Sequence, residues 1–102
     1  MRVYISGPIS GTADYKKRFE KAEKELTAKG YEVINPVKVA EILPATLSYH
    51  EYLTIDMALL STAKAIYMLE GWQNSSGAIE EYKVAAGTRK KVIFETQEKE
   101  EA

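Results

Sequence analysis

Short apolar runs alternate with longer amphipathic stretches along this chain of 102 residues. The runs are rich in β-branched and aromatic residues, which predicts four strands. These strands span Arg2–Ser6, Tyr31–Ile34, Lys64–Leu69 and Lys91–Phe94. Between the first two runs, one apolar stripe has the helical spacing that packs against a sheet; it consists of Tyr15, Phe19, Ala22 and Leu26. The pattern predicts strands that alternate with helices, in a chain whose length fits one domain.

Polar residues and glycines at the ends of the amphipathic stretches predict where the helices begin and end. Thr12 or Asp14 caps the first helix, and Gly30 follows it at a position that favours glycine. The tetrapeptide Ser-Tyr-His-Glu that begins at Ser48 is a capping box, so a second helix begins there. The pattern of residues 37–46, which lie between these helices, is ambiguous. It fits a short helical turn followed by a loop that a proline interrupts.

Continuous apolar runs separated by helices favour a parallel sheet that is covered on both faces. We therefore predict an α/β fold: a flavodoxin-like, or Rossmann-like, three-layer sandwich. Its short parallel sheet has about four strands in the order 2-1-3-4, because right-handed crossovers leave few topologies. One domain spans residues 1–94, and the acidic segment 95–102 is expected to be a flexible tail because it lacks periodicity.

Two glycine-bearing loops follow the first and third predicted strands, and parallel sheets of this order bind ligands at that point. The first loop, Gly7–Gly11, reads Gly-Pro-Ile-Ser-Gly, and its glycines permit a tight turn and a close approach of the backbone to a ligand. It matches neither a Walker A loop nor the dinucleotide fingerprint, and a plain strand-to-helix turn is the alternative. The second loop, 71–77, reaches the same edge of the sheet, so both loops favour one ligand crevice.

The helix after the second loop, which ends near Gly87, presents a carboxylate on a face of small residues. Ser75 is a typical N-cap, and the free N–H groups at the start of such a helix favour an anion. Gly77, Glu81 and Ala85 are spaced by four, so they share one helix face. Glu81, with room on both sides, therefore fits a sugar-phosphate site. The alternative is close helix–sheet packing, with Glu81 as an acid that complements the helix dipole.

A second acid, Asp56, lies on the helix that begins at the capping box. It shares a face with Tyr49, Leu53 and Leu60, so its carboxyl is expected to be partly desolvated. Desolvation raises the pKa of a carboxyl unless hydrogen bonds compensate. A solvent-facing or capping position at the helix edge is the alternative for Asp56, and the solitary His50 is expected to cap the helix or face solvent.

The charge of the chain is balanced, with 14 basic residues, 15 acidic residues and a net charge of −1. Lysines and glutamates interleave along residues 16–25, which indicates a solvated helix face and not a surface for a nucleic-acid polymer. The chain has no cysteine and one histidine, so neither thiolate nor histidine-rich metal sites are expected, and no cofactor is predicted. The apolar runs are too short for a signal peptide or a membrane span, so we expect a cytoplasmic protein without a membrane partner.

Three motifs follow one another along the chain. They are Tyr-Ile-Ser-Gly-Pro-Ile-Ser-Gly at 4–11, Asp-x-x-x-Leu at 56–60 and Ser-x-Gly-x-x-x-Glu-x-x-x-Ala at 75–85. Together they resemble the nucleoside 2-deoxyribosyltransferase superfamily, which includes 2′-deoxynucleoside 5′-phosphate N-glycosidases. The resemblance covers about residues 1–94 and is strongest to small, often phage-borne members of the superfamily.

The resemblance implies a role for each matched residue. Glu81 matches the family's nucleophile, Asp56 an aspartate near the leaving base and the sugar, and Tyr4 a tyrosine near the nucleophile. The residues that match substrate-binding positions are Gly7, Pro8, Ile9, Ser10, Ser75 and Gly77. A serine beside a helix N-terminus suits a phosphate, which an acid at that position would repel. This chemistry needs no metal.

These roles imply that the protein cleaves or exchanges the N-glycosidic bond of a 2′-deoxynucleotide or deoxynucleoside, through a covalent glycosyl-enzyme on Glu81. The alternatives are a non-catalytic nucleotide-binding module, which sequesters or senses its ligand, and an interaction domain that shares only the fold. The family forms dimers or larger rings, so we expect a homo-oligomer here as well. Apolar residues on the predicted helices support that expectation; they are Tyr49, Tyr52, Leu59 and Tyr82.

Overall fold

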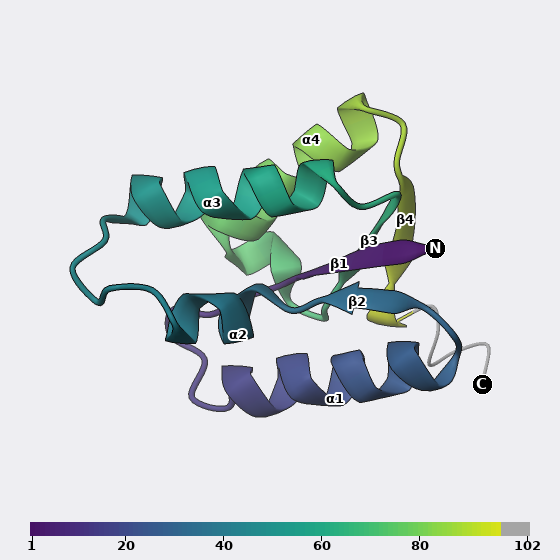
Figure 1. The fold of residues 1–102 in the computed structure, drawn as a ribbon, viewed down its shortest axis with the longest axis horizontal. Helices are drawn as coiled ribbons and strands as arrows, with labels where there is room; N and C mark the ends of the chain where they lie inside the picture. The colour runs from purple at the N-terminus through teal and green to yellow at the C-terminus, as the bar shows by residue number, and fades with distance from the viewer. Residues whose placement is uncertain (97–102) are drawn as a thin grey trace.

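Four parallel strands form one sheet in the computed structural model, which describes residues 1–96 (Figure 1). The strands are β1 (Arg2–Ser6), β2 (Glu32–Ile34), β3 (Ala65–Met68) and β4 (Lys91–Phe94). Their order is β2-β1-β3-β4, and Tyr4 of β1 stands between Ile34 of β2 and Ile66 of β3. The α/β fold and the strand order predicted from the sequence are therefore confirmed.

Helices cover both faces of the sheet and complete the three layers. They are α1 (Tyr15–Ala28), α2 (Pro36–Glu41), α3 (Tyr49–Ser61) and α4 (Ser76–Gly87), with a short 3-10 helix, η1 (Trp72–Asn74), before α4. In Figure 1, α1 lies on one side of the sheet, and α3 and α4 lie on the other. Apart from Arg2, every residue of β1 and β3 is buried, as expected of central strands in a doubly covered sheet.

The side chains of β1 alternate between two separate cores. Val3 and Ile5 pack with the apolar stripe of α1. Tyr4 faces the other way, into a core that includes Leu60 of α3 and small residues of α4. Successive side chains of a strand point to opposite faces, so Ser6 shares the face of Tyr4. As a result, the two hydroxyl side chains of β1 both point towards the layer that contains α4.

Most of the predicted helix ends are confirmed. Ser48 and Glu51 form the capping box at the start of α3, with hydrogen bonds of 3.1 and 2.8 Å. The Ser75 hydroxyl accepts a hydrogen bond of 3.2 Å from the backbone N–H of Ala78 and so caps α4. Gly30 follows α1 with a φ of +94°, a left-handed conformation that favours glycine.

Two helix starts differ from the prediction. Asp14 stands at the N-cap position of α1, but its side chain makes no capping hydrogen bond. In the ambiguous region, α2 begins at Pro36, before the segment that we expected to contain a helical turn. The Asn35 side chain caps α2 by accepting a hydrogen bond of 3.0 Å from the backbone N–H of Val37. An Asn-Pro pair that stops a strand can therefore also start a helix, because proline fits its first position.

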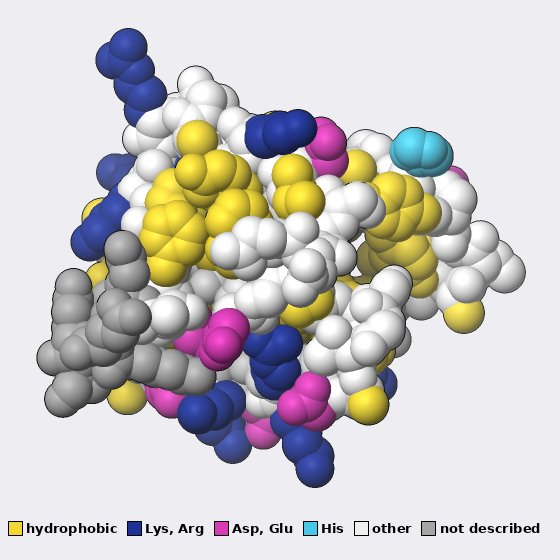
Figure 2. Space-filling view, turned by 180° about the vertical axis from the view of Figure 1, so that it is seen from behind, with side chains coloured by type: hydrophobic (Ala, Val, Ile, Leu, Met, Phe, Trp, Pro, Cys, Tyr) yellow, Lys and Arg dark blue, Asp and Glu magenta, His cyan; other side chains and the backbone are white. Residues whose placement is uncertain are grey.

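Oppositely charged side chains stand side by side along the edge of the molecule that α1 occupies (Figure 2). Lys24 Nζ lies 3.0 Å from Glu20 Oε1, and Lys21 Nζ lies 3.9 Å from Glu25 Oε1. Exposed pairs at this spacing add only a few tenths of a kcal/mol each, and they confirm the predicted solvated helix face. Within residues 1–96, no helix has both the length and the hydropathy that crossing a bilayer requires.

Tyr82 packs its ring against two other aromatic rings of the same chain. Its ring centroid lies 4.7 Å from that of Trp72 and 6.3 Å from that of Phe94, separations at which aromatic pairs attract. These three half-buried side chains, and Leu59, pack against the core below α3 and α4. Internal packing thus engages two of the residues from which we expect self-association, and the homo-oligomer stays a prediction.

The segment predicted to be a flexible acidic tail begins with an anchored residue. Glu95 is only 7% exposed, and its Oε1 accepts a hydrogen bond of 2.8 Å from the backbone N–H of Glu70. The same oxygen lies 3.8 Å from Nη2 of Arg18, which donates a hydrogen bond of 2.6 Å to the Glu70 carbonyl. The expectation is therefore wrong for Glu95; residues 97–102 lie outside the described residues.

Candidate active site

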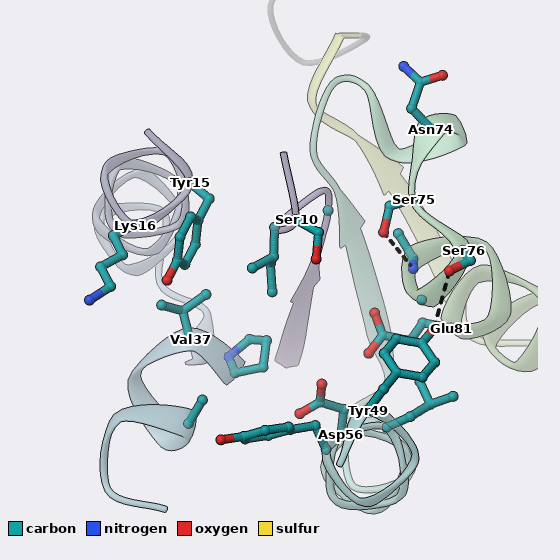
Figure 3. Close-up of a pocket in the computed structure, with 18 of the residues that line it drawn as sticks. Ser10, Tyr15, Lys16, Val37, Tyr49, Asp56, Asn74, Ser75, Ser76 and Glu81 are labelled. Carbon is teal, nitrogen blue, oxygen red and sulfur yellow. Dashed lines mark hydrogen bonds between the residues drawn. The ribbon is translucent and has the colours of Figure 1, made fainter. Parts of the chain in front are cut away.

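A cavity of about 580 Å3 opens at the carboxyl edge of the sheet, where the segments after β1, β2 and β3 meet. It lies between the Gly7–Gly11 loop, α2, the first half of α3 and the start of α4 (Figure 3). Both acids singled out in the sequence, Asp56 and Glu81, line it. The predicted crevice is thus a real cavity, of a size that suits a small organic ligand.

Two hydroxyl groups of β1 bind the Glu81 carboxylate on the side that faces the sheet. Tyr4 Oη donates a hydrogen bond of 2.5 Å to Glu81 Oε2, and Ser6 Oγ donates one of 2.6 Å to Glu81 Oε1. Tyr4 is fully buried, Ser6 is 1% exposed and Glu81 is 6% exposed. Neither hydroxyl residue lines the cavity, so they fix the carboxylate from the protein side and leave its other side to the cavity.

Burial is the dominant influence on the Glu81 carboxyl and raises its pKa above the ordinary value. The hydrogen bonds from Ser6 and Tyr4 act in the opposite direction, because they stabilise the charged form. Burial, together with the negative charges of Glu81 and Asp56, raises the pKa of Tyr4 well above its ordinary value. Tyr4 therefore remains a protonated donor, and among the described residues Glu81 has no cationic partner.

Asp56 lines the same cavity from α3, and in Figure 3 its carboxyl and that of Glu81 point towards a common space. Its side chain is half-buried. Desolvation by burial, followed by the negative charge of Glu81, raises the pKa of Asp56 to about 7. The expectation that this acid is partly desolvated on the face of Tyr49 and Leu53 is confirmed, because both of those residues also line the cavity. The two acids thus have different environments, which is how one site obtains an acid and a carboxylate at the same pH.

The start of α4 forms the polar wall of the cavity, where Ser75, Ser76 and Gly77 all face it. Tyr49 reaches across from α3, and its Oη lies 3.3 Å from Ser76 Oγ (Figure 3). A Cβ atom at Gly77 would lie 3.4 Å from the same Tyr49 Oη, so the missing side chain leaves room for this contact. The α4 N-terminus offers partial positive charge to this part of the cavity.

Three of the four residues predicted from the first loop line the cavity, namely Gly7, Ile9 and Ser10. Pro8 does not: it is buried and directed towards Gly71, where a Cβ atom would lie 3.7 Å from Pro8 Cγ. Gly7 also has a packing role, because a Cβ there would lie 2.7 Å from the Cβ of Leu69. A loop has no periodicity from which the direction of each side chain could be predicted, and a substrate-binding role for Pro8 stays a prediction.

Sequence reasoning did not single out several residues of the site. One of them is Ser6, which donates a hydrogen bond to Glu81. A signal for Ser6 existed: it lies two positions after Tyr4 on a strand, and therefore on the same face. The apolar and aromatic part of the wall was also missed as a ligand surface; it comes from Tyr15, Pro36, Val37, Ala40, Tyr52 and Leu53. Helical spacing alone does not distinguish such residues from core residues. Lys16 and Glu41 add charge at the rim.

Comparison with known proteins places the fold and the family. No curated protein matches the chain in sequence. Among solved structures, the chain is similar to the 2-deoxyribosyltransferase from Bacillus psychrosaccharolyticus, with a TM-score of 0.75, 18% sequence identity and coverage of 92% of this chain and 71% of the other. This similarity confirms, at the level of the fold, the resemblance that the three motifs indicate. Residues 1–94 match a family described as a domain of unknown function, DUF4406, and the chain belongs to that family.

Proposed function

We propose that the protein cleaves the N-glycosidic bond of a 2′-deoxynucleoside or its 5′-phosphate, through a covalent glycosyl-enzyme on Glu81. The observation that carries this proposal is the Glu81 carboxylate, buried to 6% exposure, bound through both oxygens and facing a cavity with a second acid. A buried carboxylate without a cation costs free energy that simple packing would avoid. Its place in a cavity beside a carboxyl of perturbed pKa therefore favours chemistry.

In the first step, a Glu81 oxygen attacks C1′ of the sugar as the bond from C1′ to the base nitrogen breaks. The electron pair of that bond leaves with the base, and the Asp56 carboxyl donates a proton to it. A pKa of about 7 suits Asp56 to this role, because much of the residue is protonated near neutral pH. The oxocarbenium-like transition state gains further stabilisation from the negative charge of Glu81.

In the second step, water or a second base attacks C1′, and the bond from C1′ to the Glu81 oxygen breaks. The electron pair returns to the Glu81 carboxylate, and Asp56, now ionised, accepts the proton of the attacking group. Water as the acceptor gives hydrolysis, and a base as the acceptor gives exchange. Tyr4 remains a donor to Glu81 through both steps and acts as a positioning residue.

The wall of the cavity supports a nucleoside as the substrate. Its aromatic and apolar side, which includes Tyr15 and Tyr52, offers stacking surface to a planar base. Its polar side, at the start of α4, offers Ser76 and backbone N–H groups to an oxygen-rich group on the sugar. A base on the first side and a 5′ group on the second would put C1′ between them, beside the two acids.

A direct test measures release of free base from the four common 2′-deoxynucleosides and their 5′-monophosphates. We expect release by the wild-type protein and a loss of about 1,000-fold or more in Glu81→Gln. Glu80→Gln is the matched control, because Glu80 is an exposed acid on the same helix that does not line the cavity. Calorimetric binding of these compounds without base release would instead support the nucleotide-binding module, and equal activity in both variants would contradict the role of Glu81.

A further inference from the structure

Ser6 is the second anchor of Glu81, and its position gives it no access to a ligand. It is the last residue of β1, it is 1% exposed, and it does not line the cavity. Its hydroxyl donates a hydrogen bond of 2.6 Å to Glu81 Oε1, while Tyr4 donates to the other oxygen. Any effect of Ser6 on the reaction must therefore pass through the Glu81 carboxylate.

A hydrogen bond to an ionised carboxylate stabilises the charged form more than the ester that replaces it. On formation of the glycosyl-enzyme, Glu81 loses its negative charge, so the bond from Ser6 weakens and opposes this step. On breakdown, the charge returns to the carboxylate, so the same bond becomes stronger and favours its departure from C1′. The donor thus has opposite effects on the two steps.

We propose that Ser6 is a positioning residue that makes Glu81 a better leaving group and so speeds the breakdown of the glycosyl-enzyme. The inference rests on the proposed function. In the step concerned, an acceptor forms a bond to C1′, the bond from C1′ to the Glu81 oxygen breaks, and its electron pair returns to the carboxylate. The Ser6 proton stays on Ser6 throughout and strengthens its bond to the returning charge.

Ser6 suits this task differently from Tyr4. The Tyr4 ring is part of the core under α3 and α4, so changes there also alter packing. Ser6 contributes a small side chain whose hydroxyl has a single hydrogen-bond partner among the described residues, so its replacement by alanine removes little besides that bond. Ile5→Val is a matched control: it deletes one buried methyl group from the same strand, on the face that packs against α1.

The experiment follows wild type, Ser6→Ala and Ile5→Val through turnover of a deoxynucleotide that the wild type cleaves. Acid quenching and intact-mass spectrometry give the fraction of protein that carries the sugar. We expect breakdown to slow about 10-fold in Ser6→Ala, from the loss of a hydrogen bond to a charged group, with a burst of base release and a larger labelled fraction. Ile5→Val should match the wild type.

A second measurement does not depend on turnover. The pKa of Glu81, followed by NMR of the labelled carboxyl, should rise in Ser6→Ala, because the remaining donor is Tyr4 alone. Ser6→Cys, which keeps the volume with a weaker donor, should show a smaller rise and replaces Ser6→Ala if that variant does not fold. An unchanged Glu81 pKa, or a labelled fraction equal to that of the wild type, would overturn the inference. Absence of base release by the wild type would instead contradict the proposed function. The NMR measurement would then still show whether Ser6 stabilises the charged Glu81 carboxylate.

Discussion

Tyr4 on β1 donates a hydrogen bond of 2.5 Å to Glu81 on α4, across 77 positions of the sequence. The bond joins a central strand of the sheet to the helix that forms the polar wall of the cavity. It also gives the fully buried Tyr4 hydroxyl the hydrogen-bond partner that a buried polar group needs. We therefore regard Tyr4 and Glu81 as one unit, in which the strand fixes the orientation of the carboxylate.

Tyr4→Phe removes the hydroxyl of this unit and keeps the ring in the core. We expect breakdown of the glycosyl-enzyme, and with it kcat, to slow about 10-fold, because the negative charge that returns to the carboxylate loses a hydrogen bond. The same loss should raise the pKa of Glu81 and move the acidic limb of the pH–rate profile to higher pH. Steady-state kinetics between pH 4 and 9 test this. An unshifted acidic limb would mean that Tyr4 does not act on the carboxylate.

The raised pKa of Asp56 should determine the alkaline limb of the same pH–rate profile. As the proton donor to the base, Asp56 is active in its protonated form, so kcat/KM should fall as pH rises through about 7. Asp56→Asn should remove this limb and lower kcat/KM on the order of 100-fold, the usual scale of a lost general acid. A substrate whose base is a better leaving group should show a smaller loss of kcat/KM in Asp56→Asn. If the alkaline limb near pH 7 persists in Asp56→Asn, a group other than Asp56 is responsible for it.

The stability of the protein should also depend on Asp56. Its pKa is near 4 in an unfolded chain and about 7 in the fold, so the native state binds more protons between these values. Stability from this residue is therefore present below pH 4 and is lost as pH rises through 7. As pH rises from 4 to 8, the unfolding free energy of Asp56→Asn should therefore increase by about 1–2 kcal/mol relative to that of the wild type, after allowance for solvent screening.

Denaturant unfolding of both proteins at several pH values measures this difference directly. Asp14→Asn, which removes an exposed carboxylate at the start of α1, is the control for a change of net charge. A difference that stays constant with pH would contradict the assignment of the raised pKa to Asp56.

The backbone conformation of Arg89 leads us to expect that one substitution there stabilises the protein. It follows α4 with a φ of +61°, where its Cβ is strained, and the backbone N–H of Lys90 donates to the Ala85 carbonyl at 2.9 Å. Glycine is the usual residue at this position after a helix. Arg89→Gly should therefore add about 0.5–1 kcal/mol to the unfolding free energy. Arg89→Ala keeps the Cβ and should gain nothing; an equal gain in both variants would point to the guanidinium and not the backbone.

Much of the fold could be predicted because it follows from periodicity. The alternation in β1 and the helical stripe of α1 each specify one buried face, and four apolar runs separated by helices leave few topologies. Asp56 and Glu81 were identified because each has a fixed place on a helix whose neighbours set its environment. The sequence therefore predicted which elements bring the two acids to one cavity.

The features that were missed depend on single contacts. Pro8 turns towards Gly71, Asp14 makes no cap, and Glu95 is held by the backbone of Glu70. None of these follows from a repeating pattern, because each depends on the path of a loop or on a partner distant in sequence. Ser6 differs, since its place beside Tyr4 on one strand face could have been predicted from the two-residue period of the strand.

Mass spectrometry of protein quenched with acid during turnover shows whether Glu81 forms a covalent bond to the sugar. We expect a species heavier by one 2-deoxyribosyl group, or its 5′-phosphate, with the added mass on the peptide that contains Glu81. Glu81→Gln should show no such species, and Glu80→Gln should retain it. Base release with no labelled protein, or with the label on another residue, would show that the reaction does not pass through a bond to Glu81.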